Sequence, residues 1–119
     1  MADNACPNTT AFISAGGLSK NPIYQNVSAP VNKLRTSYGN GANTPATDPN
    51  CNLAGSSNIF GRLVDGVEKE NVCTTQAKTK HISGTFIHIE QDTKERDDWN
   101  GWIKAIKEAF NLKFKGKSF

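Results

Sequence analysis

Two histidines and a pair of neighbouring carboxylates are the residues of this 119-residue chain that could carry acid–base chemistry. His81 and His88 could each act as a general base, and Asp97-Asp98 looks like a pair of catalytic acids. Neither histidine belongs to a recognisable arrangement of nucleophile, base and orienting group, and acidic residues at the start of a helix are explained by the helix dipole. No phosphate-binding loop of the form G-x-x-x-x-G-K is present. We therefore predict that the chain is not an enzyme.

The cysteines give no sign of a metal site. Cys6, Cys51 and Cys73 form no C-x-x-C pair, and their spacing to the histidines matches no zinc pattern, so no cofactor is expected. Because the sequence shows neither a signal peptide nor an apolar run near 18 residues, we expect a product made in a cytoplasm, with free thiols favoured. The pairing stays open, but an odd number leaves at least one thiol free for contact between subunits.

The charges must be positioned by the elements that carry them, and the clearest of these is an alternating strand. Thr85 to Glu90 places Ile87 and Ile89 on one face and Phe86, His88 and Glu90 on the other, since successive side chains of a strand point to opposite sides. If the strand runs unbroken from Lys78, then Lys78, Lys80 and His88 share a surface. The isoleucine face is the expected seat of the helix that follows.

That helix is predicted over residues 92–111. Asp92 at the N-cap position and Glu95 three residues later have capping-box spacing. Apolar residues then recur at helical spacing and form one stripe, which consists of Trp99, Trp102, Ile103, Ile106, Ala109 and Phe110. Burying this stripe is worth on the order of 5 kcal/mol. Gly101 lies in its middle, where close approach of another backbone is the expected reason for a glycine.

Composition favours one domain with a small core. Only 36% of the residues are apolar, so burial against a second subunit would add needed stability. We expect an arm at 1–10, a β-rich region at 11–91, the helix, and a basic tail at 112–119. Within the β-rich region, 23–38 is read as strand, although its spacing also suits a helix, and 37–58 as loop, turn or short strand. The predicted fold class is α+β, an antiparallel sheet of several strands packed by a C-terminal amphipathic helix.

The segment from Gly84 to Arg96, followed by the amphipathic helix, resembles the end of the coat proteins of the small single-stranded RNA bacteriophages. This resemblance implies a self-assembling virion protein, a homodimer whose helices cross over the partner, and a sheet face turned toward genomic RNA. The dimer interface would then comprise Trp99, Trp102, Ile103, Ile106 and Phe110. RNA would be bound by Lys78, Lys80, Phe86 and His88, through phosphate contacts and base stacking. Neither a membrane nor a small-molecule substrate is expected as a partner, and a net charge of +3 permits RNA without requiring it.

A second resemblance leads to a different function. Glu95 to Trp99, followed by Ile103 to Ile106, is similar to the closing helix of pleckstrin-homology-like domains. Such domains cap a β-barrel with a tryptophan-bearing helix and bind phosphoinositides or peptides. The N-terminal half of this chain lacks the basic, aromatic first hairpin that this ligand site requires, so this interpretation is the alternative.

Overall fold

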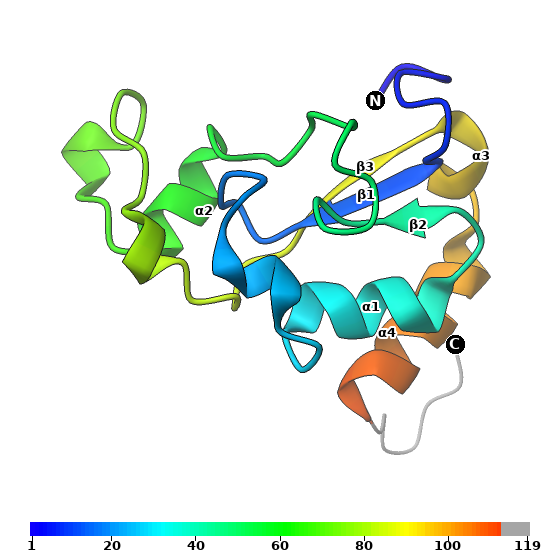
Figure 1. Ribbon diagram of the computed structural model, residues 1–119. Coiled ribbons are helices and arrows are strands. Elements are labelled where there is room, and N and C mark those ends of the chain that lie inside the picture. The colour runs from blue at the N-terminus through cyan, green and yellow to red at the C-terminus, as the bar shows by residue number, and fades with distance from the viewer. Residues whose placement is uncertain (113–119) are drawn as a thin grey trace.

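A computed structural model describes residues 1–112, and its centre is a sheet of three short strands (Figure 1). The middle strand β1 (Ala11–Ser14) pairs with β2 (Ala42–Asn43) in parallel and with β3 (His88–Gln91) in antiparallel fashion. The fold is therefore α+β, as predicted, but the sheet is mixed rather than wholly antiparallel. The basic tail predicted from Lys113 onward lies outside the described residues.

One face of the sheet is covered by two helices, α1 (Pro30–Tyr38) and α4 (Trp99–Phe110), which pack along each other. The strand predicted over 23–38 is wrong. This segment forms the short 3₁₀ helix η1 (Pro22–Gln25) and then α1. Pro30 begins α1, where its missing N–H costs nothing, and Val31, Leu34 and Tyr38 then meet the core at helical spacing.

The alternation of the strands separates two apolar clusters. Ile13 and Ile89 point to the helices, so the predicted seat for α4 is confirmed. Phe12 points the opposite way and packs with Leu53 and the Cys6–Cys51 disulfide. The preference for free thiols is therefore wrong for these two cysteines, which lie 45 residues apart in sequence and meet only through the fold, while Cys73 is free and exposed.

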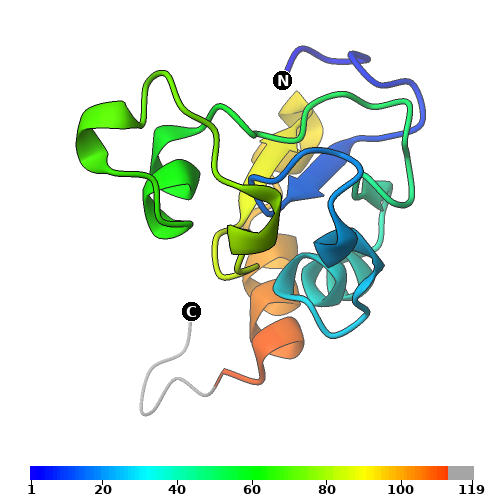
Figure 2. The same cartoon turned by 60° about the vertical axis from the view of Figure 1, so that its left-hand side comes forward.

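Residues 59–82 form a lobe that stands apart from the sheet and its helices (Figure 2). It contains α2 (Ile59–Val64) and the 3₁₀ helices η2 (Lys69–Asn71) and η3 (Thr79–His81). The buried Arg62 holds it together, because its guanidinium donates to the carbonyl oxygens of Ser56 at 3.0 Å and Val72 at 2.8 Å. The strand expected from Lys78 to Gln91 is thus observed only at its end, as β3. The β-rich description of 11–91 is too simple.

The C-terminal helix is broken into two pieces, α3 (Thr93–Arg96) and α4. The Asp92 carboxylate caps nothing, so the predicted capping box does not form. Instead Asp3 of the N-terminal arm accepts from the Thr93 N–H at 2.7 Å, and Asp98 caps α4 by accepting from the Gly101 N–H at 3.2 Å. Within residues 1–112, no helix combines the length and apolar character needed to cross a bilayer.

Candidate functional site

The apolar stripe on α4 is divided between the core and the surface. Trp102 is buried and stacks on Tyr38 with ring centroids 3.8 Å apart and planes 12° apart. Its indole N–H donates to the main-chain oxygen of Glu95 at 2.8 Å. This indole therefore finds its apolar and polar partners inside its own subunit, and a second copy is not needed to complete it.

Trp99 lies on the other side of α4 and is 73% exposed, with Ile103 one turn later also exposed. Ile106 and Phe110 are half-buried against the core. Of the five residues predicted for the dimer interface, the structure therefore leaves Trp99 and Ile103 on the outside. We call these two the α4 face.

A second exposed apolar surface lies on α2. It consists of Ile59, Phe60, Leu63 and Val64, with Phe60 66% exposed, and is called the α2 face below. Asn58 caps this helix through its side-chain oxygen, which accepts from the N–H groups of Phe60 and Gly61. Sequence reasoning missed this face because it read 59–67 as an imperfect strand. The i, i+4 spacing of Ile59 with Leu63 and of Phe60 with Val64, after an Asn cap, was the signal available.

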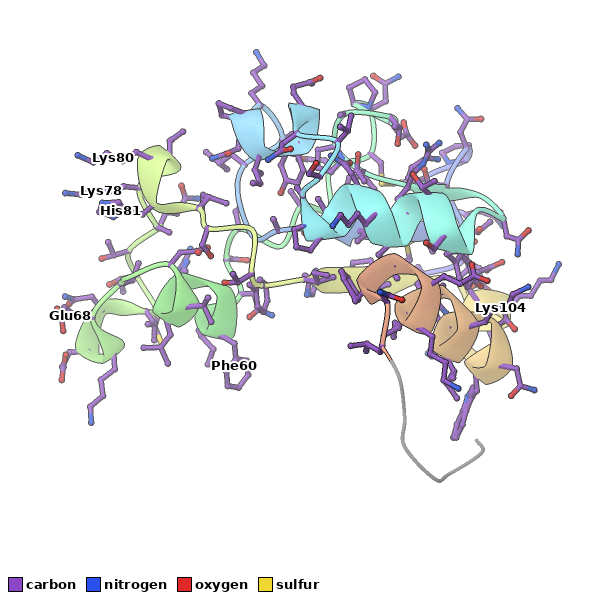
Figure 3. All side chains as sticks on the ribbon, turned by 90° about the horizontal axis from the view of Figure 1, so that it is seen from below. Phe60, Glu68, Lys78, Lys80, His81 and Lys104 are labelled. Atoms are coloured by element: carbon purple, nitrogen blue, oxygen red, sulfur yellow. A yellow bond between two sulfur atoms is a disulfide. The ribbon has the colours of Figure 1, made fainter. Side chains whose placement is uncertain are left out.

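The residues predicted to bind RNA are not on one strand. Lys78 and Lys80 lie at and inside η3, where they are exposed and gather with His81 at one end of the lobe (Figure 3). Phe86 packs closely against Gly16 and Gly61, which leaves no room for a side chain at either glycine. His88 lies on β3, with its ring centroid 6.5 Å from that of Phe86. The structure thus brings the lysines together and the rings together, in separate places.

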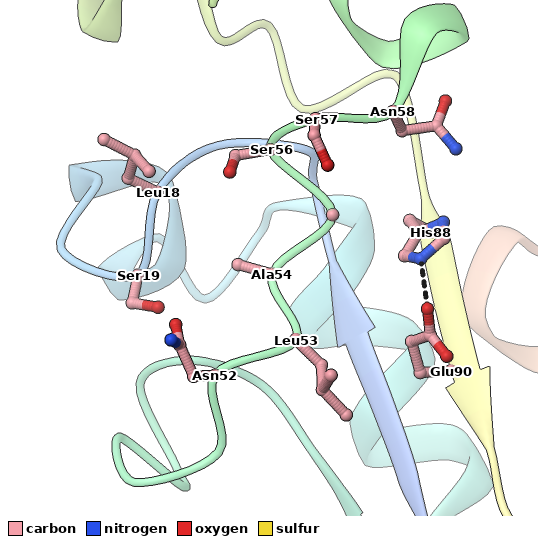
Figure 4. A pocket seen from close by; sticks show the side chains of 11 residues that line it. Leu18, Ser19, Asn52, Leu53, Ala54, Ser56, Ser57, Asn58, His88 and Glu90 are labelled. Atoms are coloured by element: carbon pink, nitrogen blue, oxygen red, sulfur yellow. Dashed lines mark hydrogen bonds and ion pairs between the residues drawn. The ribbon is translucent and has the colours of Figure 1, made fainter. Parts of the chain in front are cut away.

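His88 borders an open cavity of about 450 Å³ (Figure 4). Its Nε2 lies 3.0 Å from Glu90 Oε1, and Glu90 Oε2 lies 3.2 Å from the Met1 amine. Burial alone would raise the pKa of Glu90, but the hydrogen bonds with His88 and the amine hold that pKa below its usual value. The remaining wall is polar and comes mainly from the segment after the disulfide, and the lining is completed by Leu18, Ser19, Asn52, Leu53, Ala54, Gly55, Ser56, Ser57 and Asn58.

This cavity has a histidine–carboxylate pair but not the rest of a nucleophilic site. In the part of the chain that the structure describes, no hydroxyl or thiol is hydrogen-bonded to His88. Across the same residues, no three His, Cys, Asp or Glu side chains are grouped so that they could hold a metal ion. The chain matches no protein-family model, no curated protein and no solved structure, so its function must be inferred from its own residues and geometry.

Proposed function

We propose that this chain is a non-enzymatic, self-assembling structural subunit, of the class that forms a virion coat. The supporting observation is the presence of two exposed apolar faces on different helices. The α2 face lies on the lobe, and the α4 face lies across the molecule from it (Figure 1). Apolar patches of this kind, on a chain with few apolar residues, are typical of surfaces that associate. A subunit that builds an extended assembly needs at least two such contacts.

The charges beside the two faces favour head-to-tail contact, in which the α2 face of one copy meets the α4 face of the next. Glu68 lies on the lobe that carries Phe60, whereas Lys104 follows Ile103 on α4 (Figure 3). Head-to-tail contact brings these opposite charges toward each other, while contact between two copies of one face brings like charges together. Heterologous contacts of this type generate rings or extended assemblies, and not only pairs.

Mixing two variants tests this arrangement. Phe60→Ser damages the α2 face and leaves the α4 face intact, while Trp99→Ser does the reverse. We expect wild type to form large species in light scattering and each variant alone to be monomeric. An equal mixture should give a 1:1 dimer, because each variant supplies the face that the other lacks. Val27→Ser changes an exposed valine outside both faces and is the matched control.

Two results would contradict the proposal. A wild-type protein that stays monomeric at about 100 μM, well above the K<sub>d</sub> range of ordinary assemblies, would remove self-assembly altogether. Assembly that survives Phe60→Ser but not Trp99→Ser would replace the head-to-tail contact by a symmetric contact between α4 faces.

RNA binding is a secondary part of the proposal, supported by the exposed cluster of Lys78, Lys80 and His81 at the end of the lobe. Affinity carried by two lysines should fall as salt rises, since each phosphate contact releases counterions. Replacing both lysines by Ala should weaken binding of a single-stranded RNA in fluorescence anisotropy, whereas Lys20→Ala should not. Equal binding by all three proteins would contradict this role.

No observation favours the phosphoinositide alternative. The sheet of the described residues has three strands in the order β2-β1-β3, so it has two edges and does not close into a barrel.

A further inference from the structure

An acidic cavity of about 540 Å³ lies where the end of α1 meets the junction of α3 and α4. It is lined by Tyr38, Asn40, Lys94, Glu95, Asp97 and Asp98. One lysine among three carboxylates leaves two negative charges uncompensated at neutral pH. In residues 1–112 none of these carboxylates forms an ion pair, because the salt bridges found there involve only Glu90. The site therefore has an excess of negative charge that the described residues do not neutralise.

Glu95 is the most unusual member of this group. Its residue is only 6% exposed, yet its Oε2 atom is buried without any hydrogen-bond partner. One turn earlier on the same side of α3, Asp92 Oδ1 is also buried and unpartnered. A buried carboxylate oxygen without a donor is costly, and such groups in proteins are ordinarily paired with a cation. The missing component is therefore a donor that carries positive charge.

The other side chains of the cavity present hydrogen-bond acceptors. The Tyr38 hydroxyl donates to Asp98 Oδ2 at 2.9 Å, which leaves the lone pairs of the hydroxyl oxygen free to accept. Burial, the hydrogen bond to Asp98 and the charges of Asp98 and Glu95 all raise the pKa of Tyr38, so this hydroxyl stays protonated and keeps donating. Asp97 is exposed at the rim and adds a further acceptor.

The spacing of these groups argues for an organic cation and against a metal ion. No three acidic, histidine or cysteine side chains of the described residues are close enough to act as a ligand set. A guanidinium group, by contrast, has five N–H donors in a planar fork that can reach several separated acceptors at once. We propose that this cavity binds the guanidinium of an arginine side chain presented by a partner polypeptide. The inference uses no residue of the α2 or α4 face and does not depend on self-assembly.

The two indole N–H groups of the protein provide a direct readout. Trp102 donates to the Glu95 main chain, so its indole signal in a ¹H–¹⁵N spectrum reports on the cavity, while the exposed Trp99 is an internal reference. The probe is Nα-acetylarginine amide, titrated into the unaltered full-length chain. We expect a saturable shift of the Trp102 signal and little change at Trp99. Nα-acetylcitrulline amide has nearly the same shape without the charge and should give no saturable shift.

Variants place the effect at Glu95. Glu95→Gln keeps the size of the side chain and removes its charge, and we expect it to weaken binding of the arginine probe at least tenfold. Glu108→Gln makes the same change at an exposed position on α4 and should bind as wild type does.

Several outcomes would overturn the proposal. These are equal shifts with the arginine and citrulline probes, no saturable shift up to about 50 mM probe, which would exceed the weakest useful affinities, and unchanged binding by Glu95→Gln. Equal affinity for Nα-acetyllysine amide would overturn the choice of guanidinium. The comparison of arginine with citrulline uses only wild-type protein, so it remains decisive even if Glu95→Gln does not fold.

Discussion

Gly101→Ala provides a sharp test of the contact that starts α4. A glycine inside a helix is ordinarily worth about 1 kcal/mol less than alanine, so the change should stabilise the protein if helix propensity alone mattered. In the structure, however, a methyl group at this position would overlap the Asp98 carboxylate. That carboxylate caps α4 and accepts the Tyr38 hydroxyl, so it has little freedom to move.

The magnitude follows from the two interactions that would be lost. An N-cap is worth about 1 kcal/mol, and a hydrogen bond to a charged group about 2 kcal/mol. Subtracting the gain of about 1 kcal/mol in helix propensity leaves a net loss of about 2 kcal/mol. At roughly 5 °C per kcal/mol for a domain of this size, Tm should fall by about 10 °C. Differential scanning calorimetry measures this directly, and Asn100→Ala, at the exposed neighbouring position, is the control.

A double-mutant cycle separates the proposed cause from other effects. When Asp98 is already replaced by Ala, no carboxylate remains to be displaced, and Gly101→Ala should then stabilise the protein by about 1 kcal/mol. The reasoning is refuted if Gly101→Ala melts at or above the wild-type temperature. It is also refuted if the effect of Gly101→Ala is the same with and without Asp98.

Three further predictions concern other parts of the fold. Replacing Cys6 by Ser opens a disulfide whose cysteines are 45 residues apart and should cost about 4 kcal/mol in urea unfolding, while Cys73→Ser should change nothing. The pKa of Glu90 is lowered in the folded state, so its contribution to stability is present above its unfolded pKa and is lost as pH falls through the folded value. The Tm difference between wild type and Glu90→Gln should therefore shrink from pH 6 to pH 3, and a constant difference would contradict this. Arg62→Ala should expose the lobe to limited proteolysis while leaving the sheet and α4 intact, because two main-chain acceptors lose a charged donor worth about 2 kcal/mol. Cleavage at wild-type rates would argue against that role.

Local patterns in the sequence were sufficient for the faces of β3 and for the existence of the C-terminal helix. Alternation assigns Ile87 and Ile89 to the helix side because side-chain direction in a strand depends only on the backbone. The spacing of Trp102, Ile106 and Ala109 likewise identifies the buried side of α4. Both features depend on neighbouring residues alone, so they can be read without knowing the rest of the fold.

Tertiary structure decided the features that depend on contacts between distant residues. Asp3 takes the place of Asp92 at the start of α3, Tyr38 completes Trp102, and Cys6 reaches Cys51. In 23–38 the sequence allowed both strand and helix, and packing of Val31, Leu34 and Tyr38 against α4 and the sheet selected the helix. The orphaned Glu95 oxygen was likewise invisible in the sequence, where the residue looked like half of a capping box. Whether a charge is buried and unpaired depends on which distant segments surround it, and the local spacing of residues contains no information about that.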